Sequence, residues 1–479
     1  MFQTMKIYAL LFLLFFAART QAQEVWSLER CIKYAQDNNI TIKQALANVR
    51  TAVLSEKQAK ASRLPNLGAN VNVGEQFGRT IDPTTNTFST QATAFNSLGL
   101  NAGINLFTGG MINHSIKQAG WDLKTATAEA QRTVNDLGLL IASAYLNILL
   151  SEEQLDNANK RVAQSKTQLD VTMKLINAGT VPMADKYNIL AQIARDEQTV
   201  VQAQNTVDLG FLTLKQYLQL EPDYDLSIEQ PSSLIPADAN PDALTLSPLF
   251  EKALGTQPVI SSAGFQVKSA EESVYIAKAG YYPTLSAFAN LSTNYSSRFL
   301  DFQNGQLVGT DLVNTTLQLN GQDVLIGQYV DRYEFSKLKY FDQLDQNFGQ
   351  GVGLSLNIPI YQNGRTRLSV ERARLGVLTA QMQQTQVRQT LKNDIQTAIA
   401  NARAARQQLE AAQKTFDATN IAFQNTEKRH ELGAVNILDL TTSKTNRDMA
   451  EVDLVVAKYD YLFKLKILDF YEGKELTLN

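Results

Sequence analysis

The chain has 479 residues, a formal net charge of −3 and 19% charged residues, against roughly 25% in a typical soluble protein. This acidic balance excludes a polybasic protein that binds nucleic acid by neutralising phosphates. One cysteine and two histidines leave neither a disulfide framework nor a metal site built on those residues, so we expect no cofactor and no metal. The sequence also lacks a nucleophile elbow, an HExxH pattern and a phosphate-binding loop, so we do not expect an enzyme.

Residues 1–22 are typical of a secretory signal peptide. Lys6 supplies the basic start, and the apolar run Ile7–Ala18 is shorter than the roughly 20 residues that cross a bilayer. No later stretch holds roughly 18 consecutive apolar residues, so the mature chain is expected to have no transmembrane helix. The sequence therefore predicts an exported protein, either soluble or inserted as a β-barrel, whose strands leave a weaker signal.

Most of the remaining chain is duplicated. Residues 60–65 match 278–283 at an offset of 218, and residues 100–107 match 354–361 at an offset of 254. The larger offset also relates four single pairs: Gly110 and Gly364, Gly179 and Gly433, Asp185 and Asp439, Tyr217 and Tyr471. We therefore predict a first repeat over 23–220, a Pro-rich link over 221–247 and a second repeat over 248–479. The second repeat carries 36 more residues, all between Pro283 and Leu354.

Each repeat begins with a predicted helix, followed by two strands. Cys31 lies in the first of these helices and is expected to be buried as a small apolar residue. The strands are expected at about 66–74, 98–107, 284–292 and 351–361, where apolar residues alternate with Gly, Asn and Ser; Phe288 interrupts the alternation. Each run has about 9–11 residues, the length that a tilted strand needs to cross a bilayer. Four half-buried strands of a soluble sheet would give the same pattern.

Two long helices complete each repeat, at about 111–178 and 182–219 and at about 365–432 and 436–472. A heptad seam is typical of helices that pack along their whole length. It runs through Leu391, Ile395, Ala398 and Ala402, and recurs at Leu137, Ile141, Ala144 and Ile148. An unbroken helix of about 68 residues would reach roughly 100 Å, too long for a compact globular core. Taken alone, these helices would also fit a plain coiled-coil spacer.

Four strands cannot close a barrel, and an open edge in lipid leaves backbone groups unpaired. The smallest membrane barrels have about eight strands, so a membrane-spanning form of this chain must oligomerise. We therefore predict a mostly α protein with a membrane β-barrel, in which three copies form a 12-stranded barrel continued by an α-helical periplasmic tunnel. The Gly, Asn and Ser side of the strands would line a wet lumen.

The chain resembles the outer-membrane efflux proteins of the TolC family over Glu24–Gly473. The motifs that carry the resemblance enter and leave the strands: LPNL at 64–67 with YPTL at 282–285, and LFTGG at 106–110 with IYQNG at 360–364. The resemblance implies a homotrimer in the lipid of the outer membrane, with a long periplasmic part. It also implies two partners, a periplasmic adaptor (membrane fusion) protein and an inner-membrane transporter.

The implied function is a passive conduit that carries drugs or other small molecules from the pump and adaptor to the exterior. Two alternatives remain open. The chain would also suit an exit duct for type I protein secretion, or a non-conducting structural protein that spans the periplasm.

The resemblance further implies a pore gate after the second helix turn, where the family has a Gly, an Asp several residues on, and a second Asp three positions later. Gly433 is followed by Asp439, whereas the second acidic position is Thr442. A ring of three Asp439 carboxylates would favour cations. Asp185 is the corresponding residue of the first repeat. Either acid also suits the first turn of a helix, where the helix dipole favours negative charge.

The two helix turns match the surfaces with which the family contacts its adaptor. These residues are Gly179, Thr180 and Val181 in the first repeat and Gly433, Ala434 and Val435 in the second. A glycine that caps the end of each helix would explain the same pattern, and both roles are compatible. The segment 293–350 is predicted to face the exterior, as a solvated loop or as a structure that constricts the outer mouth.

Overall fold

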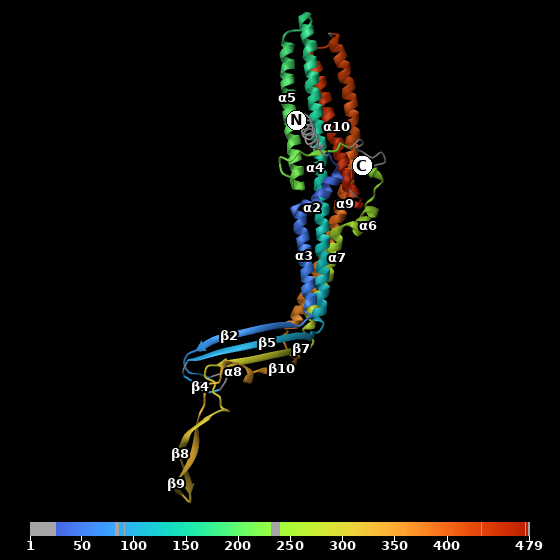
Figure 1. The fold of residues 1–479 in the computed structure, drawn as a ribbon. Helices are drawn as coiled ribbons and strands as arrows, with labels where there is room; N and C mark the ends of the chain where they lie inside the picture. Colours follow the sequence, from blue (N-terminus) through green and yellow to red (C-terminus); the bar gives the residue numbers. More distant parts are fainter. Residues whose placement is uncertain are drawn as a thin grey trace, which may run out of the picture. The chain divides into compact units, whose positions relative to one another are not determined.

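The computed structural model describes residues 25–81, 86–90, 92–230, 240–432, 434–474 and 476–477. The predicted signal peptide and Gly433 lie outside these residues. The chain divides into two units, each described here by itself. The helical unit comprises Met1–Ser55, Ala119–Ala270 and Gly376–Asn479, and the strand unit comprises Glu56–Gln118 and Glu271–Leu375. Figure 1 labels their elements.

The main sheet of the strand unit is antiparallel, with strand order β10-β7-β5-β2. Its strands are β2 (Asn66–Gln76), β5 (Thr93–Phe107), β7 (Thr284–Ser296) and β10 (Gly349–Asn357). The sequence places the end of the last strand at about 361, but β10 ends at Asn357. Pro359 explains the difference, because it has no amide hydrogen to donate to a ladder. Strands β2 and β10 form the two edges.

The strand register separates an apolar from a polar face. Leu100 lies opposite Leu291, and Ala289 lies opposite Val352, which is 86% exposed. On the other face Asn101 donates a hydrogen bond to Asn70 at 2.9 Å. The described part of the chain therefore leaves much of the apolar face exposed, as expected of a surface that meets lipid or another layer.

Phe288, which interrupts the alternation of the sequence, lies on the polar face. It is the direct cross-strand partner of Gly353. A Cβ atom at Gly353 would meet the Phe288 ring at 2.5 Å, so only glycine leaves room for the ring. The aromatic ring thus covers bare backbone rather than breaking the sheet.

The segment that carries the additional residues forms secondary structure of its own. Strands β8 (Gln306–Leu319) and β9 (Gln322–Glu334) make an antiparallel two-stranded ribbon, followed by helix α8 (Tyr340–Gln346). Between β2 and β5, the short strands β3 (Thr80–Ile81) and β4 (Phe88–Ser89) pair in the same way. The prediction of a solvated loop across 293–350 is therefore wrong for most of this segment.

The helical unit is built on four long helices, α4 (Met111–Asn177), α5 (Ala184–Leu218), α9 (Arg365–Glu431) and α10 (Ile437–Tyr471). The seam positions of α4 and α9 predicted from the heptads are buried: Leu137, Ile141, Ala144, Ile148, Leu391, Ile395, Ala398 and Ala402. Among the described residues one helix, α4, contains a window apolar enough to cross a membrane, and half of that window is buried inside the chain. Many apolar residues of α4 between Leu137 and Leu149 belong to the largest apolar core, so protein packing accounts for much of their hydropathy.

Two short helices precede the strands in each repeat, where the sequence predicts one. They are α2 (Leu28–Asn38) and α3 (Ile40–Ala61), and α6 (Leu246–Thr256) and α7 (Pro258–Ala279). The breaks fall at Asn39 and Gln257, which are related by the repeat offset of 218. Asn39 Nδ2 donates to the Tyr217 carbonyl at 2.7 Å, and Gln257 Nε2 donates to the Phe470 carbonyl at 3.1 Å. Each break therefore joins its short helices to the end of a long one.

Trp26, among the first described residues, belongs to the largest apolar core of the helical unit. Strand β1 (Val25–Trp26) pairs in parallel with β6 (Ser227–Ile228), and a 3-10 turn, η2 (Pro241–Ala243), follows the link. The Tyr145 hydroxyl lies 3.0 Å from the Trp26 carbonyl and 2.8 Å from that of Glu229. Cys31 is fully buried beside them, as predicted, and burial raises the pKa of its thiol to about 12.

Candidate gate and docking site at the helix turns

The first helix turn is closed by a glycine cap. Gly179 has a φ of 78°, a conformation that glycine adopts without steric cost. Its amide donates to the Ile176 carbonyl at 2.9 Å, and the Thr180 amide donates to Leu175 at 3.0 Å. This pair of bonds is the Schellman motif, which satisfies the last carbonyls of α4. Gly179 and Thr180 are exposed and Val181 is half-buried, so the predicted adaptor-contact residues stand at the surface of the turn.

The second turn repeats this geometry as far as it is described. The Ala434 amide donates to the Arg429 carbonyl at 2.8 Å, the counterpart of the bond from Thr180 to Leu175 at the offset of 254. Val435 is half-buried, and its carbonyl lies 3.0 Å from His430 Nδ1. Leu432, just before the turn, is 84% exposed. The turn therefore presents an apolar side chain to its surroundings.

Asp439 lies in the first turn of α10, with its side chain exposed. Its amide donates to the side chain of Asn436, the N-cap residue, at 2.8 Å. Asp439 is thus the acid that complements the start of the helix. Thr442 is exposed one turn later. Both interpretations of the sequence fit this position, because a helix-start acid with an exposed carboxylate can also face a pore.

Asp185 occupies the corresponding place in the first turn of α5 and is half-buried. Its amide donates to the Pro182 carbonyl at 3.1 Å. The preceding residue at the cap, Met183, supplies no capping side chain. The two acids of the repeat are therefore alike in their place along the helix and different in exposure and in capping.

The opposite face of α10 carries charges that sequence reasoning missed. Lys444, Arg447 and Asp448 are only 9%, 8% and 7% exposed. They continue the line of the buried Ile437 and Leu440 along the helix, at spacings of three and four residues. Charged residues at the core positions of an amphipathic helix are the signal that could have identified them.

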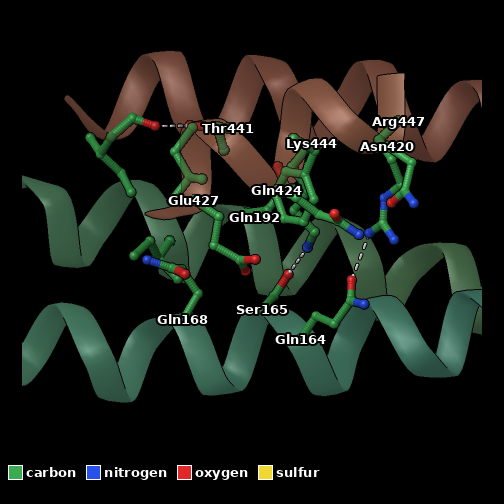
Figure 2. Close-up of a pocket in the computed structure, with 14 residues that line it drawn as sticks. Gln164, Ser165, Gln168, Gln192, Asn420, Gln424, Glu427, Thr441, Lys444 and Arg447 are labelled. Atoms are coloured by element: carbon green, nitrogen blue, oxygen red, sulfur yellow. Dashed lines mark hydrogen bonds between the residues drawn. The ribbon is translucent and has the colours of Figure 1, made fainter. Parts of the chain in front are cut away.

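Lys444 joins α10 to both helices of the first hairpin. Its Nζ donates to Ser165 Oγ on α4 at 2.6 Å (Figure 2). It also lies 3.6 Å from Asp196 Oδ2 on α5. The Ser165 hydroxyl in turn donates to Asp196, whose other oxygen accepts from Gln192 Nε2 at 2.8 Å. The buried carboxylate is thus paired with a cation and hydrogen-bonded at both oxygens, as a buried charge requires.

Arg447 and Asp448 form a second group one turn further along α10. Arg447 Nη2 donates to Gln164 Oε1 at 2.7 Å (Figure 2). The same Nη2 lies 2.7 Å from Asp448 Oδ1. Arg161 on α4 donates to the Asp448 carbonyl at 2.7 Å, and the Arg447 guanidinium lies over the Phe423 ring of α9 at 5.0 Å. Burial raises the pKa of the Asp448 carboxyl, against the attraction of Arg447, Arg161 and Lys444.

A cavity of about 240 Å³ lies between these helices. Amides and charged groups line much of its wall, among them Gln164, Gln168, Gln192, Asn420, Gln424 and Glu427 (Figure 2). The bundle near its turns is therefore held by polar contacts together with a small apolar cluster of Ile189, Ile193, Ile437 and Leu440. Within the described part of the chain, no group of three or more His, Cys, Asp or Glu side chains is placed to hold a metal ion.

A four-stranded sheet with two open edges, joined in sequence to paired helical hairpins, is the arrangement expected of a channel whose barrel is completed by further copies of the chain. The sequence model of the outer membrane efflux protein family matches residues 31–218 and 249–473. The chain therefore belongs to that family.

Individual relatives agree with this membership. Outer membrane protein TolC of Escherichia coli (strain K12) is 24% identical over 461 residues, which cover 93% of this chain and 81% of the relative. The crystal structure of CusC superposes with a TM-score of 0.74 at 16% identity, covering 94% of this chain and 92% of that one. For VceC from Vibrio cholerae the TM-score is 0.71 at 15% identity, with 94% and 96% covered.

The chain is therefore an outer-membrane channel of the kind used in tripartite efflux, and not an enzyme. Its fold is that of a trimeric channel in which each copy contributes four strands to a barrel and its long helices to a periplasmic tunnel. Channels of this family work with adaptors and inner-membrane pumps. The expectations drawn from the duplicated sequence about family, fold and location are confirmed. The roles of individual residues at the helix turns remain predictions.

Proposed function

We propose that Asp439 from three copies forms an acidic ring at the periplasmic constriction of the channel. The observation that carries this proposal is the division of α10 into two faces. Asp439 and Thr442 lie exposed on one face, whereas Lys444, Arg447 and Asp448 attach the other face to the first hairpin. A carboxylate that is exposed on a firmly attached helix is suited to line a pore, because its position is set by the buried contacts behind it.

Asp185 is proposed as a secondary member of the same gate. Its position at the start of α5 corresponds to that of Asp439 at the start of α10. Because its side chain is half-buried, its carboxylate is less exposed to a lumen than that of Asp439. With Thr442 in the second acidic position, the gate would carry a single strong ring. We therefore expect weaker cation selectivity than a double ring would give.

The two helix turns are proposed as the contact sites of a periplasmic adaptor. The exposed residues Gly179, Thr180 and Ala434 support this proposal, together with the exposed apolar side chain of Leu432. A capped turn whose backbone carbonyls are already satisfied can meet another helix end without leaving buried polar groups unpaired. Gly433 and Val435 belong to the same proposed contact.

The proposed cargo is drugs or other small molecules, delivered by an inner-membrane transporter through the adaptor. The polar Asn, Gly and Ser face of the sheet supports a water-filled lumen without a binding site of its own. In such a conduit the pump selects the cargo and the channel carries it passively.

Ion selectivity of the purified trimer in planar bilayers tests the gate. Asp439→Asn should lower the ratio of potassium to chloride permeability, and Thr442→Asp should raise it, because the ring loses or gains three charges. Asp185→Asn is the matched control and should change the ratio less. An unchanged ratio in Asp439→Asn, with normal trimer assembly, would remove Asp439 from the gate.

Dye and drug accumulation in a deletion strain tests the cargo. The deletion should accumulate the compounds, and the wild-type chain should restore export. Unchanged accumulation across several compounds, together with lost secretion of an exported protein, would favour the type I secretion duct.

Chemical cross-linking tests the adaptor contact. Ala434→Arg should reduce cross-linking to the adaptor, whereas the amount of trimer should stay unchanged. Asp223→Arg, in the exposed loop after α5, serves as its control.

A further inference from the structure

The β8–β9 ribbon is a long element without a hydrophobic partner in its own chain. Within the described residues the two strands pair only with each other, and nearly every residue along them is exposed. An isolated two-stranded ribbon is marginally stable in water at best. Both of its edges are also open to further pairing. A ribbon of this length therefore needs a surface to pack against.

The turn between the two strands of the ribbon nevertheless has a well-defined geometry. Asn320 and Gly321 connect the strands with φ values of 52° and 82°. Positive φ at both central residues is the mark of the type I′ turn, whose twist matches that of the flanking strands. The turn therefore specifies a β-hairpin with a fixed register, and the side chains of the two strands fall on two distinct faces.

One face carries more aliphatic side chains than the other. The register places six exposed aliphatic side chains on it, which we call the aliphatic face: Val313, Leu317, Leu319, Val324, Ile326 and Val330. Leu317 and Val324 are direct cross-strand partners in its centre. The opposite face intersperses Leu312, Leu325 and Tyr329 with polar residues such as Asn314 and Asp323. On the aliphatic face, the charged residues Asp311 and Arg332 lie towards the base of the ribbon, 3.7 Å apart.

The two segments that connect the ribbon to the rest of the strand unit are bonded to each other, and α8 is bonded to the main sheet. The Asp301 amide donates to the Ser336 carbonyl at 2.8 Å, and the Leu338 amide donates to Phe299 at 3.0 Å. The buried Gln343 of α8 accepts from the Ser296 amide, at the end of β7, at 3.0 Å. The ribbon therefore leaves the sheet from a defined point between β7 and the edge strand β10.

That point is next to the junction between copies. In the trimeric barrel the edge strand β10 of one copy meets the edge strand β2 of the next, so each ribbon stands one strand away from an intersubunit seam. Twelve strands spaced about 4.8 Å apart and tilted by about 40° give a barrel radius of about 12 Å. Three ribbons thus start about 12 Å from the threefold axis.

The dimensions allow the ribbons to meet. A strand of 14 residues, the length of β8, reaches about 45 Å. Three sheets that face one another about 10 Å apart lie about 6 Å from their common axis. Each ribbon therefore has to lean inward by only about 6 Å over its length.

We propose that the three β8–β9 ribbons of the trimer pack their aliphatic faces against one another on the threefold axis, as an extracellular cap that narrows the outer mouth of the channel. The cap continues the barrel interface, buries the aliphatic side chains of all three copies and leaves the more polar faces in water. It depends on the trimeric barrel and is independent of the gate proposed at Asp439.

Cysteine cross-linking tests the cap in the full-length trimer, because the native cysteine is buried in the helical unit and does not interfere. Ile326→Cys lies on the aliphatic face and Leu325→Cys, its neighbour, lies on the opposite face. Oxidation should link two of the three chains through position 326 and leave position 325 at background. Thr315→Cys and Thr316→Cys are a second matched pair, with direct partners Ile326 and Leu325, in which no large side chain is lost.

Three results would overturn the cap. Equal cross-linking at both faces would mean that the ribbons move freely. No cross-linking at either face would mean that the ribbons do not meet. If a cysteine at position 326 were then protected from maleimide in intact cells, the aliphatic face would be covered by lipid or by another protein.

Channel conductance tests the narrowing of the mouth. Replacing residues 306–334 by a short Gly-Ser link should raise single-channel conductance, and unchanged conductance would exclude a narrowed mouth. Selectivity at Asp439 is measured separately, so either proposal can fail alone.

Discussion

Removal of the Lys444 charge is the most direct perturbation of the buried contacts behind the proposed gate. In Lys444→Met the aliphatic stem is retained, but Asp196 loses the cation 3.6 Å from its carboxylate. Breaking a buried ion pair by removing one partner costs about 3–5 kcal/mol, because a buried charge is left uncompensated. Asp196 keeps its bonds from Ser165 and Gln192, so we expect the lower end of this range.

Hydrogen exchange of the trimer in detergent measures the local effect. A loss of about 3 kcal/mol corresponds to roughly 100-fold faster exchange, because each 1.4 kcal/mol is about tenfold. The faster amides should lie in the first turns of α10 and around Asp196 in α5. Thr445→Met, at the exposed neighbouring position, is the control and should leave exchange nearly unchanged.

The double variant Lys444→Met/Asp196→Asn separates a charge effect from a packing effect. With both charges gone, most of the lost protection should return, since a buried pair replaced by neutral groups is often as stable as the original. Exchange in Lys444→Met equal to that in Thr445→Met would refute the reasoning. So would a double variant whose loss equals the sum of the two single losses, because the residues would then be uncoupled.

Three further predictions concern other buried groups. Burial raises the pKa of Asp448 above its ordinary value of 3.8, so the folded chain keeps a proton that the unfolded chain has lost, and stability falls as pH rises from 3.8 through the raised pKa. Asp448→Asn should flatten this slope in thermal unfolding at a series of pH values, and an unchanged slope would contradict it. Burial raises the pKa of Cys31 to about 12, so a maleimide near neutral pH should label the unfolded chain and spare the folded one. Asn39→Ala and Gln257→Ala should each lower the free energy of unfolding by about 1–3 kcal/mol, because the carbonyl of Tyr217 or Phe470 loses its side-chain donor. Calorimetry measures this loss, and a change well below the range would contradict the prediction.

The long helices and strands could be predicted because their patterns are periodic and repeated. Seam positions such as Ile141 and Ile395 recur at one offset, and both are fully buried. Alternation along β2 and β5 placed Leu67 and Leu100 on one face, as their register shows. Periodicity reports which face is apolar, and in a duplicated chain each repeat provides an independent test of the other.

Other features depend on single contacts that no periodic pattern encodes. The helix break at Asn39 depends on one hydrogen bond to Tyr217, a residue far along the chain. The place of Phe288 depends on the missing side chain of Gly353 on the neighbouring strand. The β8–β9 ribbon was hidden for a different reason, because its two faces differ only in degree. Its Asn-Gly turn was the available signal.

The gate region also shows where the two repeats differ. At the offset of 254, Lys444 and Arg447 correspond to Leu190 and Ile193 of α5, and Ile193 is buried with Ile189 in a small apolar cluster. That cluster also contains Ile437 and Leu440 of α10, and the buried charges of α10 add contacts to α4 and α5 that have no counterpart at Leu190 and Ile193. Apolar contacts are non-directional and tolerate sliding, whereas an ion pair with hydrogen bonds at both oxygens is satisfied in one geometry. The asymmetry therefore gives α10 a defined position relative to α4 and α5. This supports the proposal that Asp439 is the stronger of the two gate acids and Asp185 the weaker one.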